Sequence, residues 1–350
     1  MIEKISTEFK NSIALKPSTL LILGTLFLLF NSSYFPGAKT FLVIIVSIAL
    51  FYIGEKYSRK FNPTLTIERE TLFYFGAALI LISLAALYFN FFAAGGIPLF
   101  NPAIRRFLSG HLTYLSFLIV PGIIFIISSF NRETSYLKIK TLFLIFFAAI
   151  MMSLLGFRTE VLAAIIAGTL TAYYMEIFNV KELFALFLLA IIAFSGVSFL
   201  RSAPETAGRA TSTIAVFDLV VERTPLLGLT DGYVQFADVI ALASITPIYS
   251  GRVLISSIIG GRVTSSSTAT IFAPPFLDFG FFGLLIFVIF GLILGATYKA
   301  ARKQKNIYAP LHALLLTFLI LGVETGIVDL IVWAYFGLTT IFLIIAHNYG

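Results

Sequence analysis

Long apolar stretches separated by short polar connections dominate the chain. Each stretch is close to the length of about 20 residues that a helix needs to cross a bilayer. They lie near 18–35, 38–54, 71–92, 111–130, 141–157, 160–178, 183–199, 279–298, 308–324 and 326–346. This pattern predicts an all-α polytopic membrane protein with about ten transmembrane helices, in which residues 1–350 form a single transmembrane domain.

Residues 200–278 interrupt this pattern between the predicted spans seven and eight. The segment is mostly polar, but its parts 211–222 and 233–244 are apolar enough to form short helices, and prolines bound them. Loops longer than about 15 residues commonly carry function. Seven spans precede this loop and three follow it, which argues against the symmetric halves of inverted-repeat transporters.

The composition excludes several classes of protein. With 59% hydrophobic and 12% charged residues, the chain cannot be a soluble domain, in which about a quarter of the residues are charged. There is no cysteine and the three histidines are far apart in sequence, so thiol catalysis is excluded and neither a metal nor a cofactor is expected. The net charge of +7 resides on the connections between spans and does not indicate nucleic-acid binding.

Lysine and arginine are distributed unevenly over these connections. If the N-terminus is cytoplasmic, fifteen of the 24 fall on cytoplasmic connections and four on short outer ones, namely Lys39, Arg105, Arg106 and Arg158. Cytoplasmic loops of membrane proteins carry the excess of positive charge. The sequence therefore predicts a multi-pass protein of the plasma membrane with both termini in the cytoplasm and the 200–278 loop outside.

The remaining basic residues are five arginines in the long loop, which contains no lysine: Arg201, Arg209, Arg223, Arg252 and Arg262. Guanidinium can grip two phosphate oxygens at once, whereas ammonium is a mobile point charge. Arg201 lies just beyond the seventh span, and Arg252 and Arg262 each stand in a Gly-Arg-Val triplet, so these three are candidates for binding phosphate. Arg209 and Arg223 can instead form surface ion pairs with acidic residues at 205, 218 and 222.

Two further arginines belong to the same predicted outer side. Arg158 stands in a short polar break within the apolar stretch 141–178, where a charge is costly and therefore marks a functional candidate. The alternative is a local pair with Glu160 that ends a helix. Arg105 follows a Gly-Gly-Ile-Pro loop, where it either binds the same anion or reaches lipid headgroups.

Sugar transfer would also need a base for a hydroxyl proton, or a carboxylate that orients the acceptor. Glu324, with Asp329 nearby, lies in apolar sequence at the outer end of the last helix pair, where a helix–helix hydrogen bond is the alternative. His111 opens the fourth span close to Arg105, where an interfacial role is the alternative. Asp278, at the end of the long loop, is a further catalytic candidate.

Three motifs carry a resemblance to a known family. GGIPLF at 95–100, LGFRTE at 155–160 and FLDFGFFG at 276–283, the last following a long outer loop, resemble the oligosaccharide repeat unit polymerases, or Wzy-like proteins. The resemblance implies a metal-independent membrane glycosyltransferase of GT-C-like fold. It also implies that the outer-side arginines bind diphosphate, in particular Arg158 together with the arginines of the long loop.

The implied reaction transfers a growing glycan from its lipid diphosphate to an incoming lipid-linked repeat unit at the outer membrane face. The expected partners are a polyprenyl- or dolichyl-diphosphate-linked oligosaccharide and membrane lipid, with a flippase or a chain-length regulator as a candidate protein partner. Two alternatives stay open. One is a transferase like the related O-antigen ligases, although these use a loop histidine and the 200–278 loop has none. The other is a flippase or transporter for lipid-linked oligosaccharide.

Overall fold

The computed structural model describes residues 16–58, 66–131, 133–200, 206–243, 250–261, 267–303 and 305–348, and within these ranges it contains helices and no strand. The α-helices are α2 Pro17–Phe30, α3 Ala38–Tyr57, α4 Arg69–Ala94, α5 Gly110–Ser116, α6 Ile119–Ser129, α7 Leu137–Leu154, α8 Arg158–Tyr174, α9 Val180–Leu200, α10 Thr206–Arg223, α11 Ala237–Ala243, α12 Gly251–Ile258, α13 Ala273–Phe279, α14 Ile286–Lys303, α15 Lys305–Thr325 and α16 Leu330–Asn348. Two short 3₁₀ helices are η3 Pro102–Phe107 and η4 Gly280–Leu285. The predicted all-α class is confirmed.

Every apolar range predicted from the sequence overlaps a helix or a pair of consecutive helices. Six helical segments are long and apolar enough to cross a membrane: 38–57, 69–94, 110–129, 137–154, 273–303 and 307–325. The chain is therefore a membrane protein with several spans, while the number of about ten stays a prediction.

Some predicted boundaries differ from the helices. The first predicted range reaches residue 35, but α2 ends at Phe30. There the side-chain amide of Asn31 donates a hydrogen bond of 2.8 Å to the carbonyl of Phe27. The predicted span 279–298 begins earlier in the structure, because α13, η4 and α14 follow one another from residue 273 to 303. Gly280 makes the bend between α13 and η4 with a φ of 58°, a conformation that suits glycine.

Glycines allow the closest helix pairs to form. A Cβ atom at Gly54 of α3 would lie 2.1 Å from the carbonyl oxygen of Val288 on α14, and one at Gly291 of α14 would lie 2.0 Å from the carbonyl oxygen of Phe51. Small residues at such interfaces let two backbones approach, which is the usual way that helices associate in lipid.

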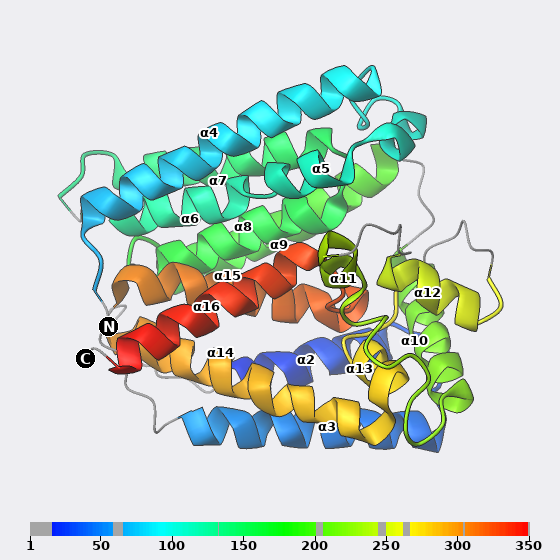
Figure 1. The fold of residues 1–350 in the computed structure, drawn as a ribbon. Coiled ribbons are helices and arrows are strands. Elements are labelled where there is room, and N and C mark those ends of the chain that lie inside the picture. Colours follow the sequence, from blue (N-terminus) through cyan, green and yellow to red (C-terminus); the bar gives the residue numbers. More distant parts are fainter. Residues whose placement is uncertain are drawn as a thin grey trace.

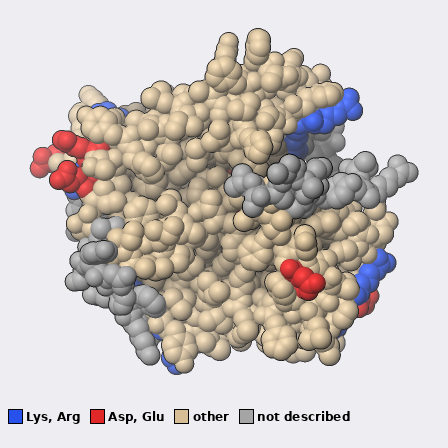
Figure 2. All heavy atoms as spheres, viewed as in Figure 1, with Lys and Arg blue, Asp and Glu red and all other residues tan. Residues whose placement is uncertain are grey.

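The helices run side by side in a bundle (Figure 1). Helix α8 lies in the interior, packed against α6, α7, α9 and α15, and nearly all of its side chains are buried. Helices α4 and α7 expose large apolar side chains instead, such as Tyr88 and Phe143. In the view of Figure 2 the flank between the two ends is almost free of charged residues, as a surface that faces lipid should be.

The two ends of the bundle differ (Figure 1). One end, here named the terminal end, carries the start of α2 and the ends of α3, α14 and α16. The opposite end, here named the loop end, carries α10 to α13, which belong to the segment 200–278. Helices α10 and α11 overlap the two short helices that the sequence predicts there, whereas α12 and α13 were not predicted.

Hydrogen bonds of Asp218 link helix α10 to residues 34–40, between α2 and the first turn of α3. The buried carboxylate of Asp218 accepts hydrogen bonds from the Tyr34 hydroxyl at 2.6 Å, from the Gly37 amide at 2.9 Å and from the Thr40 hydroxyl. Nearby, the Lys39 ammonium donates to the carbonyl oxygens of Val221 at 2.6 Å and Thr224 at 2.9 Å. The loop segment is therefore a packed part of the protein at this point.

Candidate functional site

The loop end brings together six of the residues predicted to act in a site. Their elements are η3, α5, α8, α12, α13 and α15, and the residues are Arg105, His111, Arg158, Arg252, Asp278 and Glu324. Two further candidates, Arg201 and Arg262, lie outside the described residues. Segments far apart in sequence therefore share one end of the bundle.

Two of the three sequence motifs touch each other. The amide of Leu99, in GGIPLF, donates to the carbonyl of Leu154 at 3.1 Å, directly before LGFRTE. The Arg105 guanidinium lies over the ring of Phe157 with 4.0 Å to the ring centre, a cation–π contact. Phe157 precedes Arg158 at the first residue of α8, so Arg105 and Arg158 belong to one small region.

An ion pair joins the long loop to the last two helices. The Arg252 Nη2 atom of α12 lies 2.5 Å from the Asp329 Oδ2 atom, and their side chains are 28% and 36% exposed. Asp329 stands in the short turn between α15 and α16. The pair is thus accessible enough for an anionic ligand to compete with Asp329 for the guanidinium.

A glycine fixes where Arg252 stands. A Cβ atom at Gly251 would lie 2.3 Å from the carbonyl oxygen of Val234 and 3.2 Å from the Val328 side chain. Since only glycine permits this approach, it holds the start of α12 against both the segment before α11 and the turn that contains Asp329.

Glu160 is more closely linked to the candidate site than the sequence predicts. The sequence indicates it only as a local partner of Arg158, but its side chain is buried and the charges of Asp329 and Arg252 act on it. Its Oε2 atom has no hydrogen-bond partner among the described residues. The available signal was the position of a carboxylate inside the apolar stretch 141–178, which is as costly as that of Arg158.

A third carboxylate, that of Asp238, extends the group. Asp238 of α11 accepts from the Tyr114 hydroxyl at 2.7 Å and from the Leu330 amide at 3.4 Å. Burial raises the pKa of Asp238 above its ordinary value, although the Tyr114 hydrogen bond opposes that change. We name Tyr114, Glu160, Asp238, Arg252 and Asp329 the loop-end cluster.

Arg209 has a different partner from those expected. The sequence suggested acidic neighbours within the loop, but Arg209 of α10 pairs with Glu324 at the end of α15. Asp218, one of the expected partners, is occupied by Tyr34, Gly37 and Thr40. Arg223 donates to the carbonyl of Ile258 at 2.7 Å. A predicted catalytic carboxylate, that of Glu324, is therefore linked to an arginine of the long loop.

Asp278 has a clear positioning role. Its carboxylate is fully buried and accepts from the Thr230 hydroxyl at 2.6 Å, the Val234 amide at 3.0 Å and the Gln235 amide at 2.7 Å. Gln235 in turn donates to the carbonyl of Ile327 at 3.2 Å. The motif FLDFGFFG therefore holds the segment before α11 beside the turn of Asp329, while its predicted part in catalysis stays a prediction.

His111 is exposed in the first turn of α5, at the same end of the bundle. Its catalytic role also stays a prediction. The described residues contain no group of three or more histidines, aspartates and glutamates arranged to hold a metal ion. The charged side chains of the loop-end cluster are instead one arginine and three carboxylates.

Comparison with known proteins agrees with this architecture. The family described as "Putative O-antigen polymerase" matches residues 14–336. Among curated proteins, the chain is 27% identical to "Uncharacterized protein MJ0419" of Methanocaldococcus jannaschii over 333 residues, covering 91% of each chain. It is 25% identical to "Uncharacterized protein MJ0420" of the same organism over 293 residues, covering 82% of this chain and 67% of the relative.

No solved structure matches the chain significantly. The family match nevertheless spans the described bundle from the start of α2 into α16, including all three motifs and the whole loop-end cluster. The protein therefore belongs to the O-antigen polymerase family.

Proposed function

We propose that this protein polymerises lipid-diphosphate-linked oligosaccharide repeat units, and that the reaction takes place at the loop end on the extracytoplasmic face of the membrane. One structural observation supports this proposal in addition to the family membership. The ion pair of Arg252 and Asp329 joins the loop to the last helices, and the charges of both residues act on the buried Glu160 of α8. A cation and carboxylates are thereby held together at the end of an otherwise apolar bundle.

The arginines have the chemistry that the diphosphate requires. Arg252 on α12, with Arg105 and Arg158 around Phe157, can stabilise the charge that develops on the leaving diphosphate. Arg201 and Arg262 are further candidates from the sequence. Because guanidinium groups can supply this stabilisation, the proposed reaction needs no metal ion.

The carboxylates can accept the proton that the acceptor hydroxyl loses in the reaction. An acceptor hydroxyl oxygen of the incoming unit attacks the anomeric carbon of the growing glycan while the bond from that carbon to the diphosphate oxygen breaks. The bonding electron pair stays on the diphosphate, and the hydroxyl proton passes to a carboxylate. Glu324 and Asp329 are proposed for this role because each carboxylate lies at the loop end in an ion pair with an arginine, Arg209 and Arg252 respectively. Glu160, which is buried on α8 and on which the charges of Asp329 and Arg252 act, is proposed to orient the acceptor.

The test uses purified protein and lipid-linked repeat units in detergent, so that no substrate has to cross a membrane. Longer glycans should form with these units alone and should continue to form in a chelator. Loss of product in the chelator that magnesium or manganese restores would reject the metal-independent reaction. Absence of longer glycan, together with movement of labelled lipid across sealed vesicles, would favour a flippase.

A matched pair of variants tests the site within the same assay. Arg252→Lys keeps the charge but loses the planar fork, and we expect it to form far less polymer. Arg223→Lys is the control, because Arg223 is exposed and donates to a backbone carbonyl, that of Ile258. Equal activity of both variants would remove Arg252 from the proposed site.

A further inference from the structure

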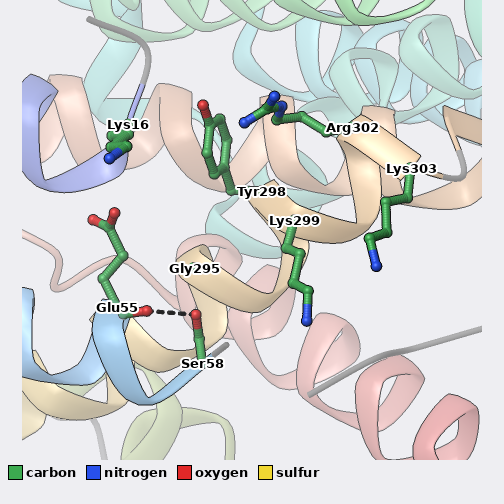
Figure 3. A pocket seen from close by; sticks show the side chains of 8 residues that line it. All are labelled: Lys16, Glu55, Ser58, Gly295, Tyr298, Lys299, Arg302 and Lys303. Atoms are coloured by element: carbon green, nitrogen blue, oxygen red, sulfur yellow. Dashed lines mark hydrogen bonds between the residues drawn. The ribbon is translucent and has the colours of Figure 1, made fainter. Parts of the chain in front are cut away.

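A second charged region lies at the terminal end of the bundle, opposite the proposed site. A cavity of about 460 Å³ opens there between the start of α2, the end of α3 and the end of α14 (Figure 3). The residues that line it are Lys16, Glu55, Ser58, Gly295, Tyr298, Lys299, Arg302 and Lys303. Its volume is within the range of about 300–1,000 Å³ that is typical of small-molecule sites.

The lining is strongly basic. The lining contains four cationic side chains and a single carboxylate, that of Glu55. Glu55 also has a structural task, because its Oε2 atom accepts a hydrogen bond of 2.8 Å from the Ser18 amide in the first turn of α2. A concave surface lined by one sign of charge concentrates its field, so the cavity attracts an anion.

The walls of the cavity are well defined. Helices α3 and α14 approach so closely that a Cβ atom at Gly295 would lie 2.3 Å from the Ser58 hydroxyl oxygen. Lys299 and Lys303 project from one side of α14, and Arg302 extends toward Tyr298, with 5.6 Å between its guanidinium carbon and the centre of that ring. Three cations within about one turn of α14 thus line the same cavity. The general excess of positive charge on cytoplasmic loops does not require that the charges line a cavity.

The surroundings indicate what kind of anion fits. On α3, which forms one wall, Tyr52 and Tyr57 are 55% and 56% exposed, and on α14 Ile289 is 57% exposed. These apolar side chains lie on helices long and apolar enough to span the membrane. A ligand with both a phosphate and hydrocarbon chains can place the phosphate in the cavity and the chains along the same two helices, α3 and α14, that line it.

We propose that this cavity is a binding site for the phosphate-bearing headgroup of an anionic membrane lipid, whose hydrocarbon chains lie along α3 and α14. Basic pockets between transmembrane helices bind such headgroups through charge and through hydrogen bonds. The site is separate from the proposed reaction centre, since the two regions lie at opposite ends of the bundle. It therefore stands whether or not the protein is a polymerase.

The test measures lipid retention by the full-length protein with native mass spectrometry. The protein is extracted into a neutral detergent and titrated with phosphatidylglycerol or with phosphatidylcholine. We expect bound phosphatidylglycerol at low micromolar lipid and little phosphatidylcholine. Inorganic phosphate and pyrophosphate are tested as competitors, and neither should displace the lipid at millimolar concentration.

Variants with equal loss of charge locate the site. In the double variant Lys299→Gln/Arg302→Gln, retention of phosphatidylglycerol should fall by about tenfold or more. The control Lys56→Gln/Lys140→Gln removes two exposed cations of α3 and α7 that do not line the cavity, and it should stay within about twofold of the wild type. Circular dichroism and gel filtration check that each variant is folded, and Lys303→Gln replaces the double variant if that one does not fold.

Several results would overturn the proposal. Equal loss of lipid in both double variants would mean diffuse attraction to a basic surface. Displacement of the lipid by millimolar inorganic phosphate or pyrophosphate would mean a site for a free anion. Retention of phosphatidylcholine as strong as that of phosphatidylglycerol would mean that the apolar helices alone hold lipid.

Discussion

Arg252 and Asp329 are 77 residues apart in the chain, yet Nη2 of the first lies 2.5 Å from Oδ2 of the second. The contact connects a short helix of the long loop to the turn between α15 and α16. Around it lie Glu160 and Tyr114, on which the charges of both partners act. This ion pair links the long loop to the turn between the last two helices of the bundle.

The first prediction concerns the coupling of these two residues. Arg252→Gln should lower the polymerisation rate by about 10- to 100-fold, the loss of one charged hydrogen bond of about 1.5–3 kcal/mol in the transition state. It should change the free energy of unfolding by only about 1 kcal/mol or less, because the pair is partly exposed. Rates and unfolding curves of Arg252→Gln, Asp329→Asn and the double variant give the coupling energy. Additive effects of the two changes would mean that the residues act separately.

The second prediction concerns the glycine that places Arg252. Gly251→Ala should move the start of α12, since the added Cβ atom would lie 2.3 Å from the carbonyl oxygen of Val234. We expect a folded protein that has lost most of its polymer synthesis. Gly208→Ala is the matched control, because a Cβ atom there meets no atom within 4 Å, and it should keep full activity. Wild-type activity of Gly251→Ala would show that the position of α12 is not critical.

The third prediction concerns the pair of Arg209 and Glu324. If Glu324 takes part in the reaction, Glu324→Gln should lower the rate far more than Arg209→Gln does, because the second variant keeps the carboxylate. If the pair only fastens α10 to α15, the two variants should lose activity and stability to the same extent. Glycan length on gels and thermal unfolding of both variants distinguish these cases.

The fourth prediction uses the acidity of Asp218. Burial alone would raise its pKa, but hydrogen bonds from Thr40, Tyr34 and Gly37 outweigh burial and hold the pKa below the ordinary value of 3.8. A lowered folded-state pKa stabilises the protein above the unfolded-state pKa, and this contribution is lost as the pH falls through the folded-state value. Asp218→Asn should therefore cost about 2 kcal/mol at pH 7 and progressively less below pH 4.

Thermal unfolding of detergent-solubilised protein between pH 7 and pH 3 measures this dependence. Glu222→Gln, an exposed change on the same helix, is the control and should leave the unfolding temperature nearly unchanged across that range. A constant difference between wild type and Asp218→Asn at every pH would contradict the proposed ionisation of Asp218.

The fifth prediction is the orientation in the membrane. The charge distribution predicts that the connection after α14 faces the cytoplasm and that the loop end faces out. The chain has no native cysteine, so single cysteines can be placed freely. In intact cells an impermeant thiol reagent should label Glu222→Cys and spare Lys303→Cys. The opposite labelling pattern would reverse the membrane face that we propose for the reaction.

The sequence alone determined the kind of protein and much of its architecture. The apolar ranges predicted the helices because a helix in lipid must satisfy its own backbone and present apolar side chains over its whole length, a requirement that is local in sequence. The motifs around Gly95, Arg158 and Asp278 likewise pointed to the correct family, which matches residues 14–336. Hydropathy did not predict boundaries such as the end of α2 at Phe30, where the Asn31 side chain donates a hydrogen bond to the carbonyl of Phe27.

Only the tertiary structure decided which charged residues meet. Arg209 has acidic neighbours in its own loop but pairs with Glu324, because Asp218 is already occupied by Tyr34, Gly37 and Thr40. Glu160 becomes part of the candidate site only because the packing of the helices lets the charges of Arg252 and Asp329 act on it. Such pairings depend on how distant helices pack, whereas hydropathy and charge asymmetry are properties of each segment by itself.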